Sequence, residues 1–226
     1  NQMMRILLSM ILIDQRNHGR SPHSNVHTYE AMVDDLKEFL DDQGIEKAIF
    51  IGHSMGGKTV MFFAKLFPER INQLIIVDIA PSDYKKLTDY SPQTINHLNI
   101  INAMSSVDFS KITSREDVDK WLSDGIKSKR VRQFLLKNLH REKDNTFSWS
   151  LNIEALKLNL SDILKGFSKE EIQSGLNIIG FPVLFIKGEL SDYITENDSL
   201  TIRRVFPYAE IQEIKNAGHW VHAEQP

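Results

Sequence analysis

Short runs that are apolar throughout recur along the first third of the chain, at residues 6–14, 47–52 and 71–81. Each run predicts a buried strand. Amphipathic segments separate the runs, and this alternation is typical of a parallel sheet flanked by helices on both faces. The first part of the sequence therefore predicts an α/β architecture.

The segment between the first two apolar runs has the periodicity of an amphipathic helix. Thr28 can serve as its N-cap and Gly44 as its stop. One helical face carries Met32, Val33, Leu36, Phe39 and Leu40. A second helix is predicted from Met55 to Phe67, where Pro68 ends it.

From about Pro81 to Gly175 the strand signals almost vanish and the pattern becomes helical. Alternation of strand and helix then resumes, with "FPVLFIKGE" and "AEIQEIKNAG" as strands around the helix "NDSLTIRRVF". The simplest account is a helical insertion within a parallel α/β core. The predicted boundaries are 1–80 and 178–226 for the core and 81–177 for a helical cap.

Composition narrows the class of protein. The chain has 226 residues, a net charge of −3 and 41% hydrophobic residues, all ordinary for a globular protein. This charge provides no general attraction for nucleic acid. The densest basic run, from Lys127 to Arg141, has interleaved apolar residues and predicts a solvated helix face.

The chain has no cysteine, which excludes disulfides, thiolate zinc sites and a cysteine nucleophile. This composition is typical of intracellular proteins, and we expect a cytoplasmic location. The apolar run from Met3 to Ile13 is too short to cross a bilayer and contains Arg5 and Ser9. We therefore expect no membrane span.

The stretch "FIGHSMGGKTV" (50–60) fits two catalytic motifs at once. As G-x-S-x-G, it places Ser54 on the nucleophile elbow of a serine hydrolase. As G-x-x-x-x-G-K-[ST], it places Lys58 and Thr59 in a phosphate-binding loop. Asp78, at the end of "LIIVD", could then hold Mg²⁺. Both motifs lie between a strand and a helix, so local pattern alone does not decide.

Three observations favour the hydrolase over the nucleotide hydrolase. Small residues at Gly52 and Gly56, two positions either side of Ser54, suit a tight elbow. The chain has no N-K-x-D-type base-reading segment and no obvious arginine finger. The segment "NAGHWVHAE" also places His219 just after a predicted strand, which the phosphate-loop interpretation leaves unexplained.

Ser54, an acid and His219 follow the chain order of the α/β-hydrolase triad. Asp78 suits the acid, since all three then follow predicted strands, at the sheet edge where ligands bind. In this hypothesis Ser54 is the nucleophile and His219 is the base. Asp78 orients the imidazole, and the backbone N–H of Met55 donates to the oxyanion.

With these residues in place, the chain resembles the YbfF-type branch of the α/β-hydrolase superfamily, which is related to abhydrolase-domain proteins and ethanol acetyltransferases. The matching segments are "IDQRNHGRSPHS", "FIGHSMGGKTVM", "IIVDIAPSDY", "VLFIKG" and "AGHWVHAEQP". The resemblance implies that Asp78 is the acid, with Asp192 and then Glu189 as alternatives. It also implies that Lys58 lies on a helix surface.

Other marked residues have structural interpretations. His53 could line the acyl pocket or support its surroundings, and Asn17, His18 and Gly19 are expected to shape a turn. Trp220 and His222 are expected to pack around the base. His23 and His27 have no carboxylates at metal-ligand spacing, so we expect no metal and no cofactor. The insertion's aromatic residues, mostly its own core, are Trp121, Phe134, Phe147 and Trp149.

The resulting functional hypothesis is hydrolysis of short- to medium-chain acyl esters or acyl-CoA thioesters through an acyl-serine. Acyl transfer to an alcohol and a catalytically silent scaffold are the alternatives, and the sequence does not indicate an oligomeric state. Related hydrolases carry an early "HG" loop that supplies a second oxyanion N–H, and nothing before Ile6 matches it. We therefore expect this polypeptide alone to be weakly active or inactive.

Overall fold

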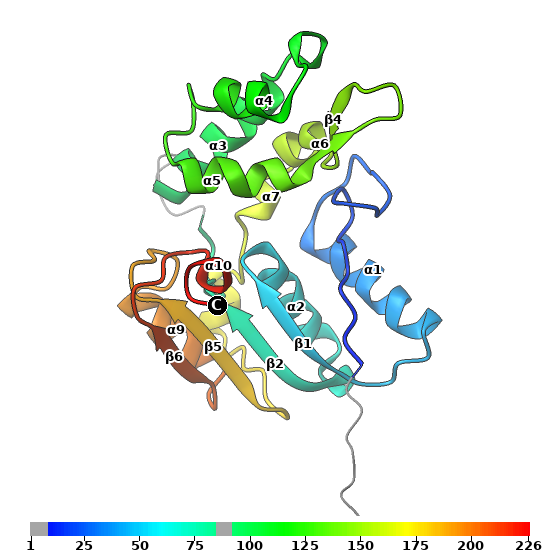
Figure 1. Ribbon diagram of the computed structural model, residues 1–226. Coiled ribbons are helices and arrows are strands. Elements are labelled where there is room, and N and C mark those ends of the chain that lie inside the picture. Colours follow the sequence, from blue (N-terminus) through cyan, green and yellow to red (C-terminus); the bar gives the residue numbers. More distant parts are fainter. Residues whose placement is uncertain (1–8, 85–91) are drawn as a thin grey trace, which may run out of the picture.

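The computed structural model of the chain describes residues 9–84 and 92–226. At its centre is a parallel sheet with the strand order β1-β2-β5-β6 (Figure 1). The strands are β1 (Ala48–His53), β2 (Ile71–Val77), β5 (Val183–Gly188) and β6 (Glu210–Ile214). This arrangement confirms the predicted α/β architecture.

Three helices support these strands, of which one precedes β1, one connects β1 to β2 and one connects β5 to β6. They are α1 (Tyr29–Asp42), α2 (Met55–Leu66) and α9 (Glu196–Val205). In Figure 1, α2 and α9 lie behind the sheet, and α1 packs against α2. The predicted start of α1 is confirmed, because the Thr28 side chain accepts a hydrogen bond from the N–H of Ala31. A 3₁₀ turn (Pro68–Arg70) follows α2, and α10 (Val221–Glu224) is the last element.

The two faces of β1 differ in their cover. Phe50 packs against Phe63 of α2, with ring centroids 5.2 Å apart. Side chains alternate along a strand, so Ile49 and Ile51 point to the opposite face. They are 47% and 70% exposed. Within residues 9–84 and 92–226, helices therefore cover only one face of β1, whereas the sequence predicted cover on both.

The strand predicted at 6–14 is wrong for its described part, since residues 9–14 adopt no regular secondary structure. Residues 6–8 lie outside the described residues. Met10 and Leu12 are largely exposed, and β1 pairs only with β2 among the described strands. An apolar run becomes a strand only when its backbone joins a hydrogen-bonded ladder, and no described neighbour supplies one here.

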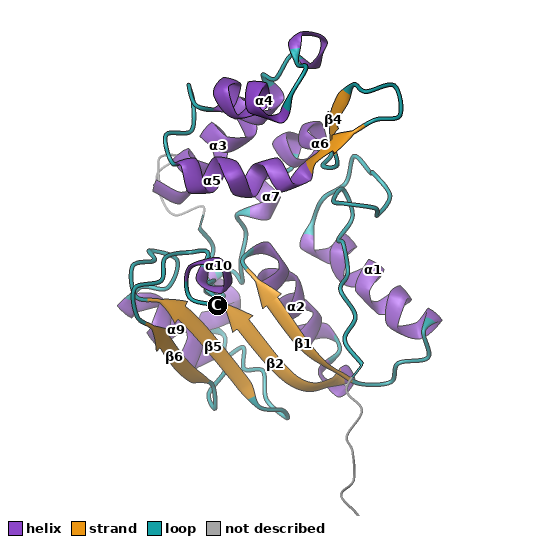
Figure 2. Cartoon of the chain, viewed as in Figure 1, coloured by secondary structure: helices purple, strands orange, loops and turns teal. Residues whose placement is uncertain are grey.

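Beyond the carboxyl ends of the strands lies a second layer, which we call the helical layer (α3–α7) (Figures 1 and 2). It consists of α3 (Pro92–Ser105), α4 (Arg115–Leu122), α5 (Lys129–Leu135), α6 (Ile153–Leu158), α7 (Leu160–Ile163) and the 3₁₀ turns Phe109–Lys111 and Leu136–Asn138. No helix in the part of the chain that the structure describes combines the length and apolarity needed to cross a membrane.

The helical layer also contains a hairpin that the sequence did not predict. Strands β3 (Leu139–Arg141) and β4 (Phe147–Trp149) pair antiparallel around a turn with Asn145 at a φ of 69°. Each strand has only three residues, too few for the apolar–polar alternation by which strands are recognised. The helix predicted up to Arg141 was therefore too long, because it included β3.

Helix α8 (Lys169–Gln173) packs with the core, although the sequence placed these residues in the insertion. It contacts α9, and Lys65 of α2 forms an ion pair with Glu171. The residue boundaries of the core and the insertion stay a prediction.

The two connections between the sheet and the helical layer run side by side. The N–H of Tyr84 donates to the carbonyl of Leu164, at 2.9 Å, and the N–H of Phe167 donates to that of Pro81, also at 2.9 Å. We call the outgoing segment, residues 81–84, the exit segment. The chain therefore enters and leaves the helical layer at one place.

Lys58 contacts this exit segment from α2, and its predicted position on a helix surface is wrong. The residue is 1% exposed. Its ammonium donates a hydrogen bond to the carbonyl of Ser82 and lies 4.8 Å from the ring centroid of Tyr84. The Ser82 hydroxyl in turn donates to Asp198 of α9, at 3.0 Å. Lys58 thus joins the core to the exit segment.

Burial lowers the pKa of Lys58 from 10.5 to about 7, against the opposing charges of Asp83 and Asp198. The folded chain therefore holds this proton more weakly than the unfolded chain does. Between about pH 7 and pH 10.5 the unfolded state binds more protons, so this group raises the free energy of unfolding as pH rises, by at most about 1.4 kcal/mol per pH unit.

The substitution Lys58→Met retains most of the apolar volume of the buried side chain but removes its titratable amine. We expect the free energy of unfolding of the wild type, relative to Lys58→Met, to increase as pH rises from 7 to 9. Urea denaturation across this range measures the difference, and the exposed-site variant Lys47→Met is the control. A difference that stays constant with pH would contradict the assignment.

Candidate active site

Ser54 occupies a one-residue turn between β1 and α2. Its φ of 51° and ψ of −119° lie in a region that costs a non-glycine residue backbone strain. The N–H of Ser54 donates to the carbonyl of Val77 in β2, at 3.0 Å. The turn projects the Ser54 side chain from the carboxyl edge of the sheet, at the start of α2.

The glycines around this turn have unequal steric roles. A Cβ on Gly52 would lie 2.5 Å from the carbonyl oxygen of Gly56. On Gly57 it would lie 2.5 Å from Ile79. On Gly56 its nearest neighbour would be the Gln15 side chain, at an ordinary 3.6 Å. The expected need for a minimal residue at Gly56 is therefore wrong, and Gly52 and Gly57 are the tight positions.

Asp78 follows β2 and is fully buried. Its N–H donates to the carbonyl of Ile186, at 2.7 Å, which holds the residue against the end of β5. Its carboxylate accepts hydrogen bonds from the N–H of Gly188, at 2.8 Å, and from the Ser191 hydroxyl. A buried charge is tolerated only when such donors replace water.

His219 lies in the loop after β6 and contacts both of these residues. Its Nδ1 lies 2.9 Å from Asp78 Oδ2, and its Nε2 lies 3.0 Å from Ser54 Oγ. With the Nδ1 proton donated to the carboxylate, the Nε2 lone pair faces the serine hydroxyl. The structure thus brings Ser54, His219 and Asp78 together into what we call the Ser–His–Asp array.

Glu189, one of the alternative acids, has a different partner. The Glu189 carboxylate accepts a hydrogen bond from the N–H of Asn216, at 2.8 Å. This contact supports the loop that carries His219. The carboxylate in contact with the His219 ring is that of Asp78.

A glycine at the end of β5 lets the His219 loop approach. A Cβ on Gly188 would lie 2.4 Å from the carbonyl oxygen of Gly218. The N–H of Leu190 donates to the carbonyl of Ala217, at 2.8 Å, and closes this approach. The loops after β5 and β6 are therefore fixed to one another directly beside Asp78.

His53 supports the backbone of the array and does not bond to its side chains. Its Nε2 donates to the carbonyl of His219, at 2.8 Å. Burial, together with the nearby His219, lowers the pKa of His53 to about 4, so the ring is neutral near pH 7. Trp220 packs on Phe134 of α5, with ring centroids 3.9 Å apart, and so connects the loop to the helical layer.

Met55 begins α2, so its backbone N–H has no partner within the helix. The positive end of the helix dipole lies at the same point.

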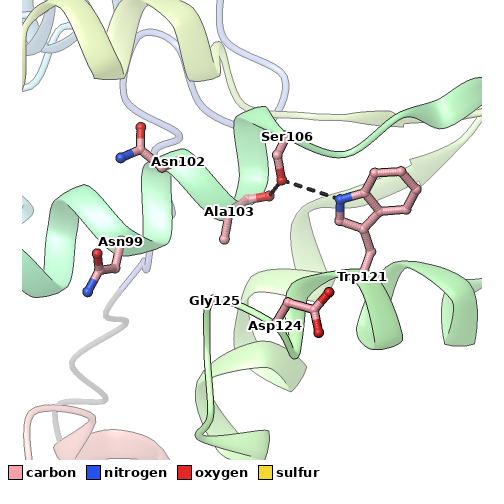
Figure 3. Close-up of a pocket in the computed structure, with 7 residues that line it drawn as sticks. All are labelled: Asn99, Asn102, Ala103, Ser106, Trp121, Asp124 and Gly125. Atoms are coloured by element: carbon pink, nitrogen blue, oxygen red, sulfur yellow. Dashed lines mark hydrogen bonds between the residues drawn. The ribbon is translucent and has the colours of Figure 1, made fainter.

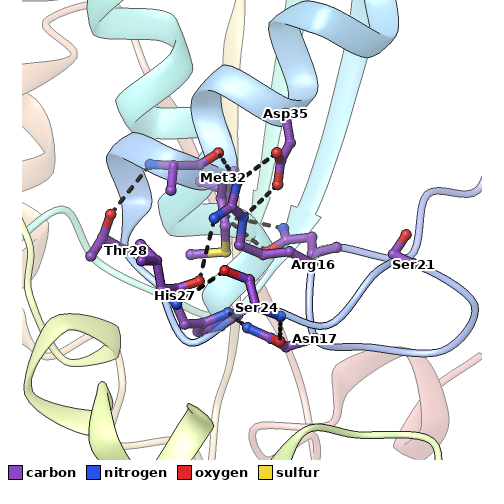
Figure 4. A network of polar contacts seen from close by, with 12 residues as sticks. Arg16, Asn17, Ser21, Ser24, His27, Thr28, Met32 and Asp35 are labelled. Carbon is purple, nitrogen blue, oxygen red and sulfur yellow. Dashed lines mark hydrogen bonds and ion pairs between the residues drawn. The ribbon is translucent and has the colours of Figure 1, made fainter.

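The side chain of Met55 has a separate contact, because its sulfur lies 3.2 Å from Nε2 of His27. Burial lowers the pKa of His27 to about 4, and its Nδ1 lies 3.2 Å from the buried amide of Asn17. Figure 4 shows Asn17 and His27 in the polar network of the segment before α1 and the start of that helix.

Several residues that surround the array were not predicted from the sequence. Ser191 donates to Asp78, and the ring of Tyr193 stacks on that of His219. Both lie in "KGELSDY", at the carboxyl end of a predicted strand. This position at the sheet edge where ligands bind is the one signal in the sequence that could have identified them. His97 of α3 bonds to Tyr193, and nothing in its local sequence marks it.

A separate cavity of about 330 Å³ lies within the helical layer, between α3 and α4 (Figure 3). Asn102, Ser106, Trp121 and Asp124 are among its lining residues, and the array does not reach it. In the described ranges, no group of three or more His, Asp or Glu side chains is arranged to hold a metal ion.

Comparison with known proteins agrees with this geometry. Residues 9–226 match the family model described as the alpha/beta hydrolase fold. The chain therefore belongs to the alpha/beta hydrolase fold family, as the resemblance of its motifs implied.

Within this family, the chain is similar to several individual esterases and lipases. The chain is 39% identical over 222 residues to the sn-1-specific diacylglycerol lipase ABHD11 of Danio rerio, covering 96% of this chain but only 65% of that protein. It is 37% identical over 218 residues to esterase YbfF of Escherichia coli, covering 96% of this chain and 78% of that protein. A solved marine microorganism esterase has 44% identity and a TM-score of 0.86, over 94% of this chain and 78% of its own.

The different space around Gly52 and Gly56 leads to a prediction about stability. Gly52→Ala forces a methyl group against the backbone of α2, so we expect a loss of more than about 2 kcal/mol in the free energy of unfolding. Gly56→Ala has room for its methyl group and gains helix propensity, so we expect a change of at most about 1 kcal/mol. Urea unfolding of both variants tests this, and equal losses would contradict it.

Proposed function

We propose that this protein is a serine esterase that cleaves carboxylic esters through an acyl-serine intermediate. The observation that carries the proposal is the position of His219, within hydrogen-bond distance of both the Ser54 hydroxyl and the buried Asp78 carboxylate. A serine hydroxyl becomes a nucleophile when a neighbouring imidazole removes its proton. The esterases and the lipase among the relatives support the same chemistry.

The proposed reaction has two halves. In the first, Ser54 Oγ attacks the ester carbonyl carbon while its proton passes to Nε2 of His219. The tetrahedral intermediate collapses, and the imidazolium returns that proton to the departing alcohol or thiol. In the second half, His219 deprotonates a water molecule that attacks the acyl-serine, and the released Ser54 oxygen is reprotonated. Asp78 stabilises the imidazolium in both halves.

The developing oxyanion requires hydrogen-bond donors that are already in place. We assign one to the backbone N–H of Met55, which follows the nucleophile and has no partner within α2. Its position at the positive end of α2 favours negative charge there. One such donor typically contributes about 10²–10³ in rate.

We further propose that the helical layer acts as a cap that selects the acyl group. The layer lies beyond the carboxyl edge of the sheet (Figure 1), and Ser54 follows the carboxyl end of β1 at that edge. Phe134 of α5 already reaches Trp220, the neighbour of His219. Short- to medium-chain acyl esters, including acyl-CoA thioesters, are the proposed substrates.

Covalent labelling tests the assignment of the nucleophile. A fluorophosphonate probe reacts with an activated serine even where turnover is weak, so it is expected to label the wild type and not Ser54→Ala. Asp78→Asn should slow labelling by up to about 10⁴-fold, because the imidazole loses its orienting carboxylate. Intact-mass spectrometry and in-gel fluorescence measure the extent and rate.

Two variants serve as controls for this experiment. Lys58→Met removes the cation that the phosphate-loop interpretation needs and should label at nearly the wild-type rate. Asp192→Asn removes the alternative acid and should do the same. Labelling of Ser54→Ala, or a larger loss in Asp192→Asn than in Asp78→Asn, would contradict the proposed roles.

The substrate class has its own test. Initial rates with p-nitrophenyl esters of increasing acyl length, beside the matching acyl-CoA thioesters, are expected to be highest for short or medium chains. The physical reason is that an enclosing cap limits the acyl volume beside Ser54. Rates that rise steadily to long chains would contradict the proposed size limit and leave the nucleophile assignment intact.

A further inference from the structure

The loop after β5 places an aromatic ring directly against the imidazole of His219. The Tyr193 ring is stacked on it, with centroids 3.8 Å apart and an interplanar angle of 19°. Tyr193 is itself buried. The ring therefore covers one face of the imidazole and limits rotation of that side chain.

Tyr193 is held in this position from several directions. Its hydroxyl lies 3.0 Å from Nε2 of His97, in α3 of the helical layer. Its carbonyl accepts a hydrogen bond from the hydroxyl of Tyr84, in the exit segment. Its N–H donates to Ser191 Oγ, at 3.3 Å, and the same hydroxyl donates to Asp78.

The charge states favour a neutral, electron-rich ring in this place. Burial, with a contribution from the charge of Asp78, raises the pKa of Tyr193 to about 12. Burial and the proximity of His219 lower the pKa of His97 to about 4. Near pH 7 the contact between Tyr193 and His97 is thus a neutral hydrogen bond, and the phenol face remains available to a cation.

We propose that Tyr193 is a positioning residue for His219: its ring fixes the plane of the imidazole and stabilises the imidazolium, and His97 holds that ring from the helical layer. A cation over an aromatic face is attracted by the ring quadrupole. In the proposed reaction the imidazolium exists only between proton removal and proton return, so this attraction acts where the barrier is highest. The inference rests on the proposed function.

Other groups also face the imidazole and must be held constant in a test. Asp78 contacts its Nδ1 and Ser54 its Nε2. The neutral His53 ring lies 4.8 Å away from the side of β1, and the Trp220 ring is 5.4 Å away. All four of these side chains are retained in the variants at Tyr193, so a change in titration between those variants reports the stacked ring.

The first experiment measures the protonation of His219 by NMR, which requires no catalysis. We expect the midpoint of its ring titration to move to lower pH by roughly 0.4–1.5 pH units in Tyr193→Leu. Tyr193→Phe keeps the ring but loses the contact of its hydroxyl with His97, so its midpoint should lie between those of the wild type and Tyr193→Leu. Replacement of Tyr193 by pentafluorophenylalanine keeps the ring shape but reverses its face charge, so it should behave like Tyr193→Leu.

The second experiment measures the rate of labelling by the fluorophosphonate probe. Tyr193→Leu is expected to slow it roughly 2- to 30-fold, and the lower limit of its pH profile should move in the same direction as the titration. His97→Leu and Tyr193→Phe each remove the hydroxyl contact, so their effects should not add in the double variant.

The outcomes separate this inference from the proposed function. An unlabelled wild type whose His219 titration still responds to Tyr193→Leu would overturn the esterase and support the stacking. A labelled wild type whose titration midpoints are the same with leucine, phenylalanine and pentafluorophenylalanine would overturn the stacking alone. Circular dichroism and urea midpoints establish that the compared variants are folded. If Tyr193→Leu does not fold, the comparison of the pentafluorophenylalanine variant with Tyr193→Phe tests the stacking instead.

Discussion

The arrangement of the site depends on one buried carboxylate. Asp78 has no access to water, and a charge in that position must find its hydrogen bonds within the protein. Gly188, Ser191 and His219 supply them, from the end of β5, the loop after it and the loop after β6. Satisfying this single anion therefore brings together segments more than a hundred residues apart in the chain. The alignment of His219 with Ser54 follows from the same requirement.

Much of this could be predicted from the sequence, because the relevant signals are local. The apolar runs and helix stops located β1, β2, β5 and α2, and Thr28 located the start of α1. Parallel strands place their carboxyl ends at one edge, so residues that follow such strands are brought near one another. That rule is the reason why Ser54, Asp78 and His219 could be selected together before any geometry was known.

The remainder depends on contacts between distant segments, which no local pattern contains. The family resemblance implied an exposed position for Lys58, yet its partner is a carbonyl in the exit segment. Gly56 satisfies the motif, but the close approach occurs at Gly52. Tyr193 and His97 meet only because α3 lies over the sheet edge. A tyrosine and a histidine 96 residues apart give no periodic signal.

The buried amine of Lys58 has a consequence for how the two layers can separate. It joins the helix that carries Ser54 at its start to the exit segment, where both connections to the helical layer also meet. An amine-reactive reagent cannot reach this nitrogen while that joint is closed, because local opening must come first. The modification rate of this one lysine would therefore report how often the contact between α2 and the exit segment opens.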